Sequence, residues 1–289
     1  MIYDVVIIGS GPAGISASLY TARANLKTII ISKKEGALIK AGEVENYYGF
    51  SKPIDSLELL DNGYKQAGNL GVEIIEDEVV NIGFDGNYVI TGKQNVISAK
   101  SVVIATGTNR AAPNIKGLVE LEGKGVGYCA VCDGFFYKQK DVAVLGFADY
   151  ALHEASELVN IVKKVTILTN GQEPKVKFPD NMNIITKKVK QIVGVEHVSK
   201  VIFDDDSEID VEAVFVAYGT AGSVDLAKKI GANVANNKIV VDDNMMTSLP
   251  GLYAAGDCVG GMLQIAKAVY EGAKASTSII KYIRTLNQK

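Results

Sequence analysis

The feature that most constrains the fold lies at the N-terminus, where an apolar run leads directly into a glycine-rich turn. Tyr3–Ile8 and Thr28–Ile31 are mostly apolar runs of strand length, and Pro12–Asn25 between them has the length of a helix. A strand, a helix and a strand within about 30 residues define a βαβ unit, whose crossover is right-handed. The chain is therefore expected to begin an α/β fold with a parallel sheet.

The turn itself, Gly-Ser-Gly-Pro-Ala-Gly over residues 9–14, is typical of a phosphate-binding loop because it ends a strand and opens a helix. Gly9 allows the tight turn, Gly11 lets the backbone approach a pyrophosphate, and Gly14 lets the helix pack on the strand. The helix N-terminus adds N–H donors and positive potential. Glu35, about 20 residues on, is placed to accept from a ribose hydroxyl. The pattern favours a dinucleotide site over a glycine turn without a ligand.

Two later strand ends bear on the same nucleotide. Thr106 and Gly107 follow one apolar run, and Gly256 and Asp257 follow the run Leu252–Ala255. Asp257, which precedes a helix expected from about Gly261 to Arg284, can accept hydrogen bonds from a ribityl chain, and the positive helix end can face a developing flavin anion. Together with the first turn, these strand ends form the pattern of a flavoprotein with two dinucleotide-type domains.

Composition argues against several other classes of protein. The net charge is −3, so general nucleic-acid binding is not expected. No segment has the ~18 consecutive apolar residues of a membrane span. The N-terminus has neither the basic region nor the cleavage site of a signal peptide. The 3 cysteines cannot form a disulfide framework, so we expect a cytoplasmic protein.

The strand–helix alternation restarts in the middle of the chain, which indicates a second domain. Expected strands at Val142–Leu145 and Val165–Thr169 surround an expected helix at Tyr150–Val162. Two connectors rich in Gly and Pro, residues 107–117 and 241–251, bracket this region. We therefore expect two Rossmann-like, three-layer ββα domains, the second inserted into the first: residues 1–108 with 242–289, and residues 109–241.

Cys129 and Cys132 form a Cys-x-x-Cys pair, which indicates redox or metal chemistry. Cysteines three apart at a helix start can close a disulfide, and a helix N-terminus lowers the pKa of a thiol toward the reactive thiolate. The neighbouring Asp133 can carry the proton that exchange requires. A zinc site would need two more ligands, and the remaining cysteine and histidines stand in no paired spacing. A pair of inert buried cysteines is the other alternative, and Cys258 is expected to be a small buried residue.

Four motifs, in this order, resemble those of the low-molecular-weight thioredoxin reductases along nearly the whole chain. They are Gly-Ser-Gly-Pro-Ala-Gly at 9–14, Glu-Val-Glu-Asn at 43–46, Cys-Ala-Val-Cys-Asp-Gly-Phe-Phe at 129–136, and Gly-Asp-Cys at 256–258. The third string is the most specific. Two departures touch the flavin site: the chain has Gly-Ala-Leu at 36–38 where members often carry Gly-Gln-Leu, and Leu-Gln-Ile at 263–265 where they carry Arg-Gln-Ala.

This resemblance implies FAD as the cofactor, a homodimer, and thiol–disulfide exchange with thioredoxin. It implies that Cys132 faces the flavin, that Cys129 attacks the disulfide of the partner, and that Asp133 is the acid–base group. Asn46 and Gln264 match positions near the isoalloxazine ring. The residues that we assign to FAD are Gly9, Ser10, Gly11, Pro12, Ala13, Gly14, Ser32, Lys33, Glu35, Asn46, Val79, Thr106, Gly107, Gly256, Asp257, Gln264 and Ile265.

The inserted domain departs from a nicotinamide-binding domain at both places that would hold the nucleotide. Its first turn reads Gly-Phe-Ala-Asp-Tyr-Ala, so Ala148 stands where a glycine lets a pyrophosphate approach, and Phe147 and Tyr150 bring bulk into the turn. The next strand ends in Leu-Thr-Asn-Gly at 168–171, where the family has a His-Arg-Arg for the 2′-phosphate of NADPH. The sequence therefore argues against NADPH, although the backbone of an altered loop could still bind a nucleotide.

Another electron donor is then required. The pattern resembles the ferredoxin-dependent flavin thioredoxin reductases, which keep the FAD site and the cysteine pair without a working pyridine nucleotide site. We therefore expect a thioredoxin-disulfide reductase that uses reduced ferredoxin. The lysine-rich segment 163–200 is either a dock for an acidic ferredoxin or an ordinary solvated face. The alternatives are a reductase that uses NAD(P)H or a reduced deazaflavin, an oxygen-dependent dithiol oxidase, and a non-catalytic flavin-binding module.

Overall fold

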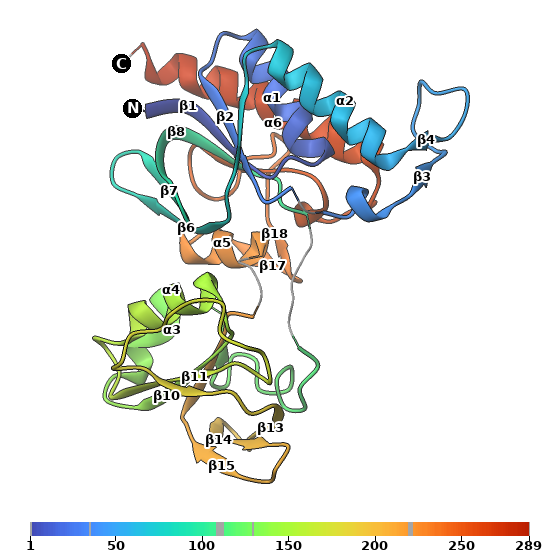
Figure 1. Cartoon of the computed structure of the whole chain (residues 1–289). Helices are drawn as coiled ribbons and strands as arrows, with labels where there is room; N and C mark the ends of the chain where they lie inside the picture. Colours follow the sequence, from blue (N-terminus) through green and yellow to red (C-terminus); the bar gives the residue numbers. More distant parts are fainter. Residues whose placement is uncertain (1, 35, 108–112, 129, 219–221, 289) are drawn as a thin grey trace. The chain divides into compact units, whose positions relative to one another are not determined.

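The computed structural model describes residues 2–34, 36–107, 113–128, 130–218 and 222–288, and it divides the chain into two compact units (Figure 1). The first unit comprises Met1–Asn109 and Gly222–Lys289, and the second comprises Arg110–Ala221. Each unit contains a parallel sheet with helices, so the α/β class that the sequence predicts is confirmed. Among the described residues, no helix is long and apolar enough to cross a membrane.

The second boundary between the units lies at Ala221, whereas the sequence analysis put it at 241. Residues 222–241 belong with the first unit because helix α5 (Ser223–Lys229) is fixed to it. The ammonium of Lys229 donates to the carbonyl oxygen of Val80 at 2.9 Å, and the hydroxyl of Ser223 donates to the carbonyl oxygen of Gly107 at 2.9 Å. The turn-forming residues of 241–251 had suggested a linker, but they form an internal turn of this unit.

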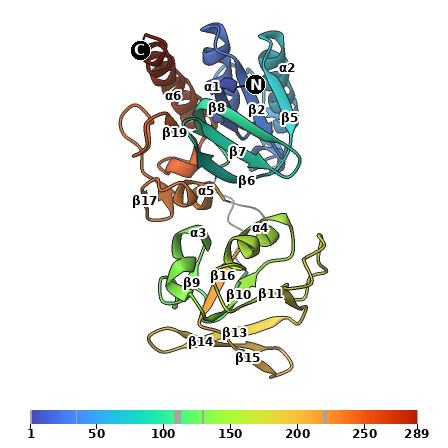
Figure 2. The ribbon, with the colours of Figure 1, turned by 90° about the vertical axis from the view of Figure 1, so that its left-hand side faces the viewer.

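The first unit is a sheet covered on one face by long helices (Figure 2). The sheet order is β5-β2-β1-β8-β7-β6, with β19 also paired to β8. Strands β1 (Ile2–Ile8), β2 (Thr28–Ser32), β5 (Glu73–Glu76), β8 (Val96–Ile104) and β19 (Leu252–Ala254) are parallel, while β6 (Val79–Phe84) and β7 (Tyr88–Gly92) continue the sheet as an antiparallel pair. Helices α1 (Pro12–Arg23) and α6 (Ile265–Leu286) pack against each other, and α2 (Ser56–Asn69) lies beside α1.

Buried β-branched side chains explain why this sheet forms. Val5, Ile7, Ile30 and Val103 are fully buried in one cluster with small residues of α1 and α6. The short elements of this unit lie in its connections. They are η1 (Leu38–Lys40), β3 (Glu43–Val44), β4 (Ile54–Asp55), β17 (Val234–Ala235), β18 (Lys238–Ile239) and η3 (Asp257–Val259).

The second unit has three layers. Its parallel sheet has the order β12-β11-β10-β16-β9, formed by β9 (Val126–Gly127), β10 (Asp141–Leu145), β11 (Lys164–Leu168), β12 (Asn183–Ile185) and β16 (Ala213–Val216). Helices α3 (Ala130–Asp133), η2 (Gly134–Tyr137) and α4 (Asp149–Leu158) lie on one face. The antiparallel strands β13 (Val189–Gly194), β14 (Val198–Phe203) and β15 (Glu208–Asp210) lie on the other (Figure 1). An apolar cluster fills each interface.

Two expected helices differ at their ends. The helix expected to reach Val162 ends at Leu158, where the amides of Ile161 and Val162 both bond to the carbonyl oxygen of Leu158. The C-terminal helix was expected from Gly261 but begins at Ile265, because Gly261 has a left-handed φ of +75° that no helix accommodates. Of the residues before the helix, Gln264 is extended and is its N-cap residue.

Candidate functional site

The turn between β1 and α1 has the geometry of an anion-binding loop. Gly9 has a φ of +107°, and a Cβ at Gly14 would overlap the carbonyl oxygen of Gly9. Gly11 is the extended N-cap residue, and no side chain of the described residues caps the helix there. A Cβ built on Gly11 meets nothing within 4 Å. The space beside Gly11 is therefore open at a helix start without a side-chain cap, as a diphosphate requires.

Thr106 supplies a second observation at the same place. It follows the carboxyl end of β8, and a Cβ on Gly9 would overlap the neighbouring carbonyl oxygen of Ala105. The hydroxyl oxygen of Thr106 is buried and has no hydrogen-bond partner among the described residues. A buried hydroxyl without a partner is costly, so this atom is suited to a bound polar group.

The turn after β19 is held by two charged residues that the sequence analysis missed. Lys267 of α6 donates to the carbonyl oxygens of Gly256, at 2.9 Å, and Gly260. The carboxylate of Glu271, one helical turn on, lies 2.9 Å from the ammonium of Lys267 and accepts from the amide of Gly256 at 2.9 Å. Asp257 lies inside this clamped turn. The i, i+4 spacing of Lys267 and Glu271 was visible in the sequence, but it is equally typical of a solvated helix face.

Asn46 and Gln264, assigned to the flavin ring by resemblance, lie together. The amide nitrogen of Asn46 donates to the amide oxygen of Gln264 at 2.9 Å, across a separation of 218 residues. Asn46 follows β3, and Gln264 is the N-cap residue of α6. Both side chains are exposed. The two ends of the first unit thus meet at the N-terminus of α6, with Ile265 as its first residue.

A second group of residues assigned to FAD lies at the carboxyl ends of β1 and β2 and the start of β6. The hydroxyl of Ser10 donates to that of Ser32 at 2.7 Å and lies 2.9 Å from the hydroxyl of Tyr64. The ammonium of Lys33 lies 3.5 Å from the buried carboxylate of Glu78. Tyr64 and Glu78 were missed, because only folding brings them to this strand end. Val79, next to Glu78, is buried at the start of β6, and Glu35 lies outside the described residues.

Both cysteines belong to the stretch of chain that forms the second unit, and Cys132 lies within α3. Cys129 lies outside the described residues, and only the backbone of Cys132 is described, within α3. Asp133 ends this helix close to Tyr137, and burial together with the charge of Asp133 raises the pKa of the Tyr137 hydroxyl. A carboxylate directly after Cys132 suits the acid–base role expected for Asp133.

Cys258 differs from the pair. Its thiol is buried against the carbonyl oxygens of Ile104 and Ala255, at 3.4 and 3.3 Å. Burial raises the pKa of Cys258 to about 12, so its thiol stays protonated at neutral pH. Among the described residues, no group of three or more His, Cys, Asp or Glu side chains could hold a metal ion.

The turn between β10 and α4 is occupied by aromatic rings. The rings of Phe147 and Tyr218 meet edge to face with centroids 5.1 Å apart, at the carboxyl ends of β10 and β16. The ammonium of Lys175 lies 5.4 Å from the centroid of the Phe147 ring. Tyr150 was expected to add bulk to this turn, but its ring is buried in the core and adds none.

The carboxyl end of β11 also makes hydrogen bonds within the second unit. The side-chain oxygen of Asn170, after β11, accepts from the amide of Val189 at 2.8 Å. The arginines of the chain are Arg23, Arg110 and Arg284, none of them near this strand end in sequence. The arginine pair that would hold a 2′-phosphate is therefore absent from the sequence here.

Several lysines of the segment 163–200, on or next to β13 and β14, are paired with acidic residues of the stretch 204–210. Lys187 lies 2.6 Å from Asp205, and Lys190 lies 2.5 Å from Asp206. Lys200 bonds Glu208 at 2.8 Å, and Lys188 approaches Asp204 at 3.7 Å. These ion pairs are exposed, and they cancel most of the local positive charge. The solvated-face interpretation of these lysines is the better supported one.

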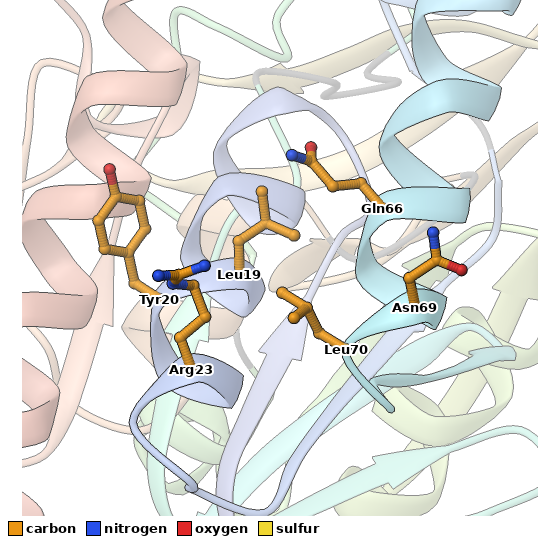
Figure 3. Close-up of a pocket in the computed structure, with 6 residues that line it drawn as sticks. All are labelled: Leu19, Tyr20, Arg23, Gln66, Asn69 and Leu70. Atoms are coloured by element: carbon orange, nitrogen blue, oxygen red, sulfur yellow. The ribbon is translucent and has the colours of Figure 1, made fainter.

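The first unit also has an open hollow of about 500 Å³ between the C-terminal parts of α1 and α2 (Figure 3). Leu19, Tyr20 and Arg23 line it from α1, and Gln66, Asn69 and Leu70 line it from α2 and its end. It lies at the opposite end of α1 from the glycine turn, so it is distinct from the candidate anion-binding loop.

The comparisons with known proteins agree on one class. The family model described as pyridine nucleotide-disulphide oxidoreductase matches residues 3–272. The thioredoxin reductases of Aquifex aeolicus and Peptoclostridium acidaminophilum are 34% and 35% identical to this chain. Each alignment covers 98% of this chain, and 94% and 97% of the relatives.

Two solved structures are similar over the whole length. The atypical thioredoxin reductase TRi from Desulfovibrio vulgaris Hildenborough has a TM-score of 0.92 and 35% identity, and 98% of each chain is covered. A ferredoxin-flavin thioredoxin reductase from Clostridium acetobutylicum has a TM-score of 0.70 and 31% identity, with 100% of this chain and 99% of that chain covered.

The chain therefore belongs to the pyridine nucleotide-disulphide oxidoreductase family, and within it to the flavin-dependent thioredoxin reductases. Its cofactor is FAD. The uncapped start of α1, the open space at Gly11 and the buried hydroxyl of Thr106 fit this group.

Proposed function

We propose that this protein reduces the disulfide of thioredoxin through Cys129 and Cys132, with electrons from reduced ferredoxin and not from NADPH. The FAD-binding residues are those assigned above, in the first unit, residues 1–109 with 222–289. The second unit carries the cysteine pair on a fold that resembles a nicotinamide-binding domain. Bound FAD supplies a group that accepts single electrons and delivers pairs to a disulfide.

The observation that supports this choice of donor is the aromatic pair of Phe147 and Tyr218. In an open α/β sheet, a dinucleotide binds outside the carboxyl ends of the strands, where its pyrophosphate meets the first helix. Both rings lie at such strand ends, and the amide of Lys175 donates to the carbonyl oxygen of Phe147 at 2.7 Å. Ala148 stands where a glycine would let a pyrophosphate approach, and the two rings add bulk at this turn.

The strand end that would hold the 2′-phosphate of NADPH gives independent support for this choice of donor. NADPH differs from NADH by a phosphate that proteins hold with arginine. Here the matching strand end offers Asn170, and its side-chain oxygen is already used by Val189. The Clostridium acetobutylicum structure, whose name includes both ferredoxin and flavin, is consistent with a ferredoxin donor for this chain.

The cysteines carry out the exchange with thioredoxin. The thiolate of Cys129 attacks one sulfur of the thioredoxin disulfide, and that S–S bond breaks as a mixed disulfide forms. Cys132 then attacks the sulfur of Cys129, which releases thioredoxin as a dithiol and leaves the Cys129–Cys132 disulfide. Asp133 holds and returns the proton that moves in these steps. Two electrons pass from the cysteine pair to thioredoxin in each cycle.

An anaerobic absorbance titration tests the donor. Reduced ferredoxin is expected to bleach the flavin band of the purified protein, and NADPH is expected to leave it unchanged. Bleaching by NADPH would overturn the ferredoxin proposal and favour the altered-loop alternative. Bleaching by a small dithiol, followed by oxygen consumption without thioredoxin reduction, would favour the dithiol oxidase.

The resemblance also supports a homodimer. Light scattering of the FAD-loaded protein at micromolar concentration is expected to give twice the chain mass of 30.8 kDa. A monomeric mass across that concentration range would contradict this part of the proposal.

A further inference from the structure

Helix α4 presents three buried side chains, one helical turn apart, to the segment that carries the cysteines. The hydroxyl of Tyr150 donates to the carbonyl oxygen of Tyr128 at 3.3 Å. The carboxylate of Glu154 accepts from the amide of Ala130 at 2.7 Å. A Cβ on Gly134 would come within 2.7 Å of the side chain of Leu158, so this glycine permits close packing on α4. The two hydrogen bonds flank position 129 in the sequence.

Glu154 is unusual because it is a carboxylate that is only 1% exposed. A buried carboxylate is costly unless it is hydrogen-bonded. Ala130 is the first residue of α3, so its N–H group has no partner within that helix. Glu154 satisfies this donor from a neighbouring element, and neither the FAD loops nor the altered nucleotide turn involves it.

We propose that Glu154 is a positioning residue for the redox pair. With Tyr150, it fixes the backbones of Tyr128 and Ala130, the sequence neighbours of position 129. A disulfide closes only over a narrow range of Cα separations, so a segment with fewer backbone conformations closes it at a smaller entropic cost. The inference rests on the proposed redox role of Cys129 and Cys132.

The equilibrium of the cysteine pair with glutathione tests this proposal on the FAD-loaded protein. In that reaction, two thiols of the protein give two electrons and two protons to oxidised glutathione, and the products are the protein disulfide and two reduced glutathione molecules. Alkylation of the remaining thiols, followed by mass spectrometry, gives the oxidised fraction.

Glu154→Leu removes the acceptor and is expected to lower this equilibrium constant about fivefold, which matches the loss of one hydrogen bond. Glu154→Gln keeps an acceptor oxygen and is expected to stay within about twofold of the wild type. The equilibrium constant of Tyr150→Phe is expected to lie between those of Glu154→Leu and Glu154→Gln. Glu157→Gln, an exposed carboxylate on the same helix, is the matched control and is expected to show no change.

Val144→Ala, in the core of β10, is the control for a general loss of stability. It is expected to lower the melting temperature and to leave the equilibrium constant of the cysteine pair unchanged. The proposal is overturned if Glu154→Leu and Tyr150→Phe both match the wild type, or if Glu154→Gln falls as far as Glu154→Leu. If the wild-type cysteines form no disulfide with each other in this titration, the proposed function itself fails, whatever the variants do.

Discussion

Lys267 and Glu271 are the residues through which α6 holds the turn at Gly256. The side chains of both are almost buried, at 13% and 11% exposed, and each also bonds backbone groups of the turn. Such a pair matters chiefly because each charge would be uncompensated without the other. The role that we propose for the pair in the flavin site is therefore indirect, through the placement of Asp257.

Lys267→Met is expected to lower the free energy of unfolding by about 3 kcal/mol, because it leaves the carboxylate of Glu271 buried without its cation. The double variant Lys267→Met/Glu271→Met is expected to regain part of that loss. Urea unfolding measures both. Lys281→Met, an exposed lysine on the same helix, is the control. If Lys267→Met were as stable as this control, the proposed contribution of the Lys267–Glu271 pair to stability would be contradicted.

Cys132→Ser is expected to abolish the reduction of thioredoxin while leaving FAD bound, because the pair can no longer form a disulfide. Thioredoxin-dependent reduction of a chromogenic disulfide and the flavin absorbance spectrum measure the two effects. Cys258→Ala is the matched control, since that buried thiol is protonated and is expected to play no part in exchange. Retained activity in Cys132→Ser would contradict the proposed electron path.

Among individual residues, the sequence predicts those whose roles depend on residues nearby in the chain. The glycines of the first turn were recognisable because their roles depend on neighbours within one βα turn. Asn46 and Gln264 could be paired only through family resemblance, since 218 residues separate them. Tyr64 and Glu154 carried no local signal at all, because a hydrogen bond to a distant backbone or side chain leaves no spacing pattern.

The hairpin loop between β7 and β8 shows how a single side chain holds two elements together. The carboxylate of Asp77, just before β6, accepts from the amides of Lys93, Gln94 and Asn95 and from the side chain of Asn95, at 2.9 to 3.3 Å. Burial alone would raise the pKa of Asp77, but these donors outweigh it and hold that pKa below its usual value.

Asp77→Asn is expected to cost about 2 kcal/mol at pH 7, because the amide replaces an acceptor oxygen with a donor that faces other donors. The folded pKa of Asp77 lies below its unfolded value, so its contribution is present at neutral pH and is lost as the pH falls from about 4 through the folded pKa. Urea unfolding at a series of pH values measures this. If the free energy of unfolding fell equally with decreasing pH in the variant and in the wild type, the role assigned to Asp77 would be contradicted.

Whole elements were predictable where continuous apolar runs and the lengths between them decided the assignment, as in β1, α1 and β10. The end of α4 and the start of α6 were misplaced by about four residues, which is the usual uncertainty at helix ends. The boundary at 241 failed for another reason. Residues 241–251 have the composition of a linker, yet Asp242 and Met246 bond each other and Met246 pairs with Tyr253.

On the scale of the whole molecule, the two units have similar folds and different expected ligands. Hydrogen exchange can test this in one experiment. Adding FAD to protein stripped of flavin is expected to slow amide exchange in residues 9–14 and 256–264. Adding NADPH to the FAD-loaded protein is expected to leave exchange in residues 142–151 unchanged, because Phe147 and Tyr218 occupy that turn. Slower exchange there with NADPH would contradict the proposed loss of the nucleotide site.

The discontinuous first unit has a consequence for synthesis on the ribosome. Strand β19 and the 22-residue helix α6 come from the end of the chain, yet they pair with β8 and pack against α1. The second unit, Arg110–Ala221, is continuous and emerges in full before them. It can close its cores while the N-terminal half still lacks a strand and a covering helix. The N-terminal part of the first unit therefore completes its sheet and its helical cover only after residues 252–286 have emerged.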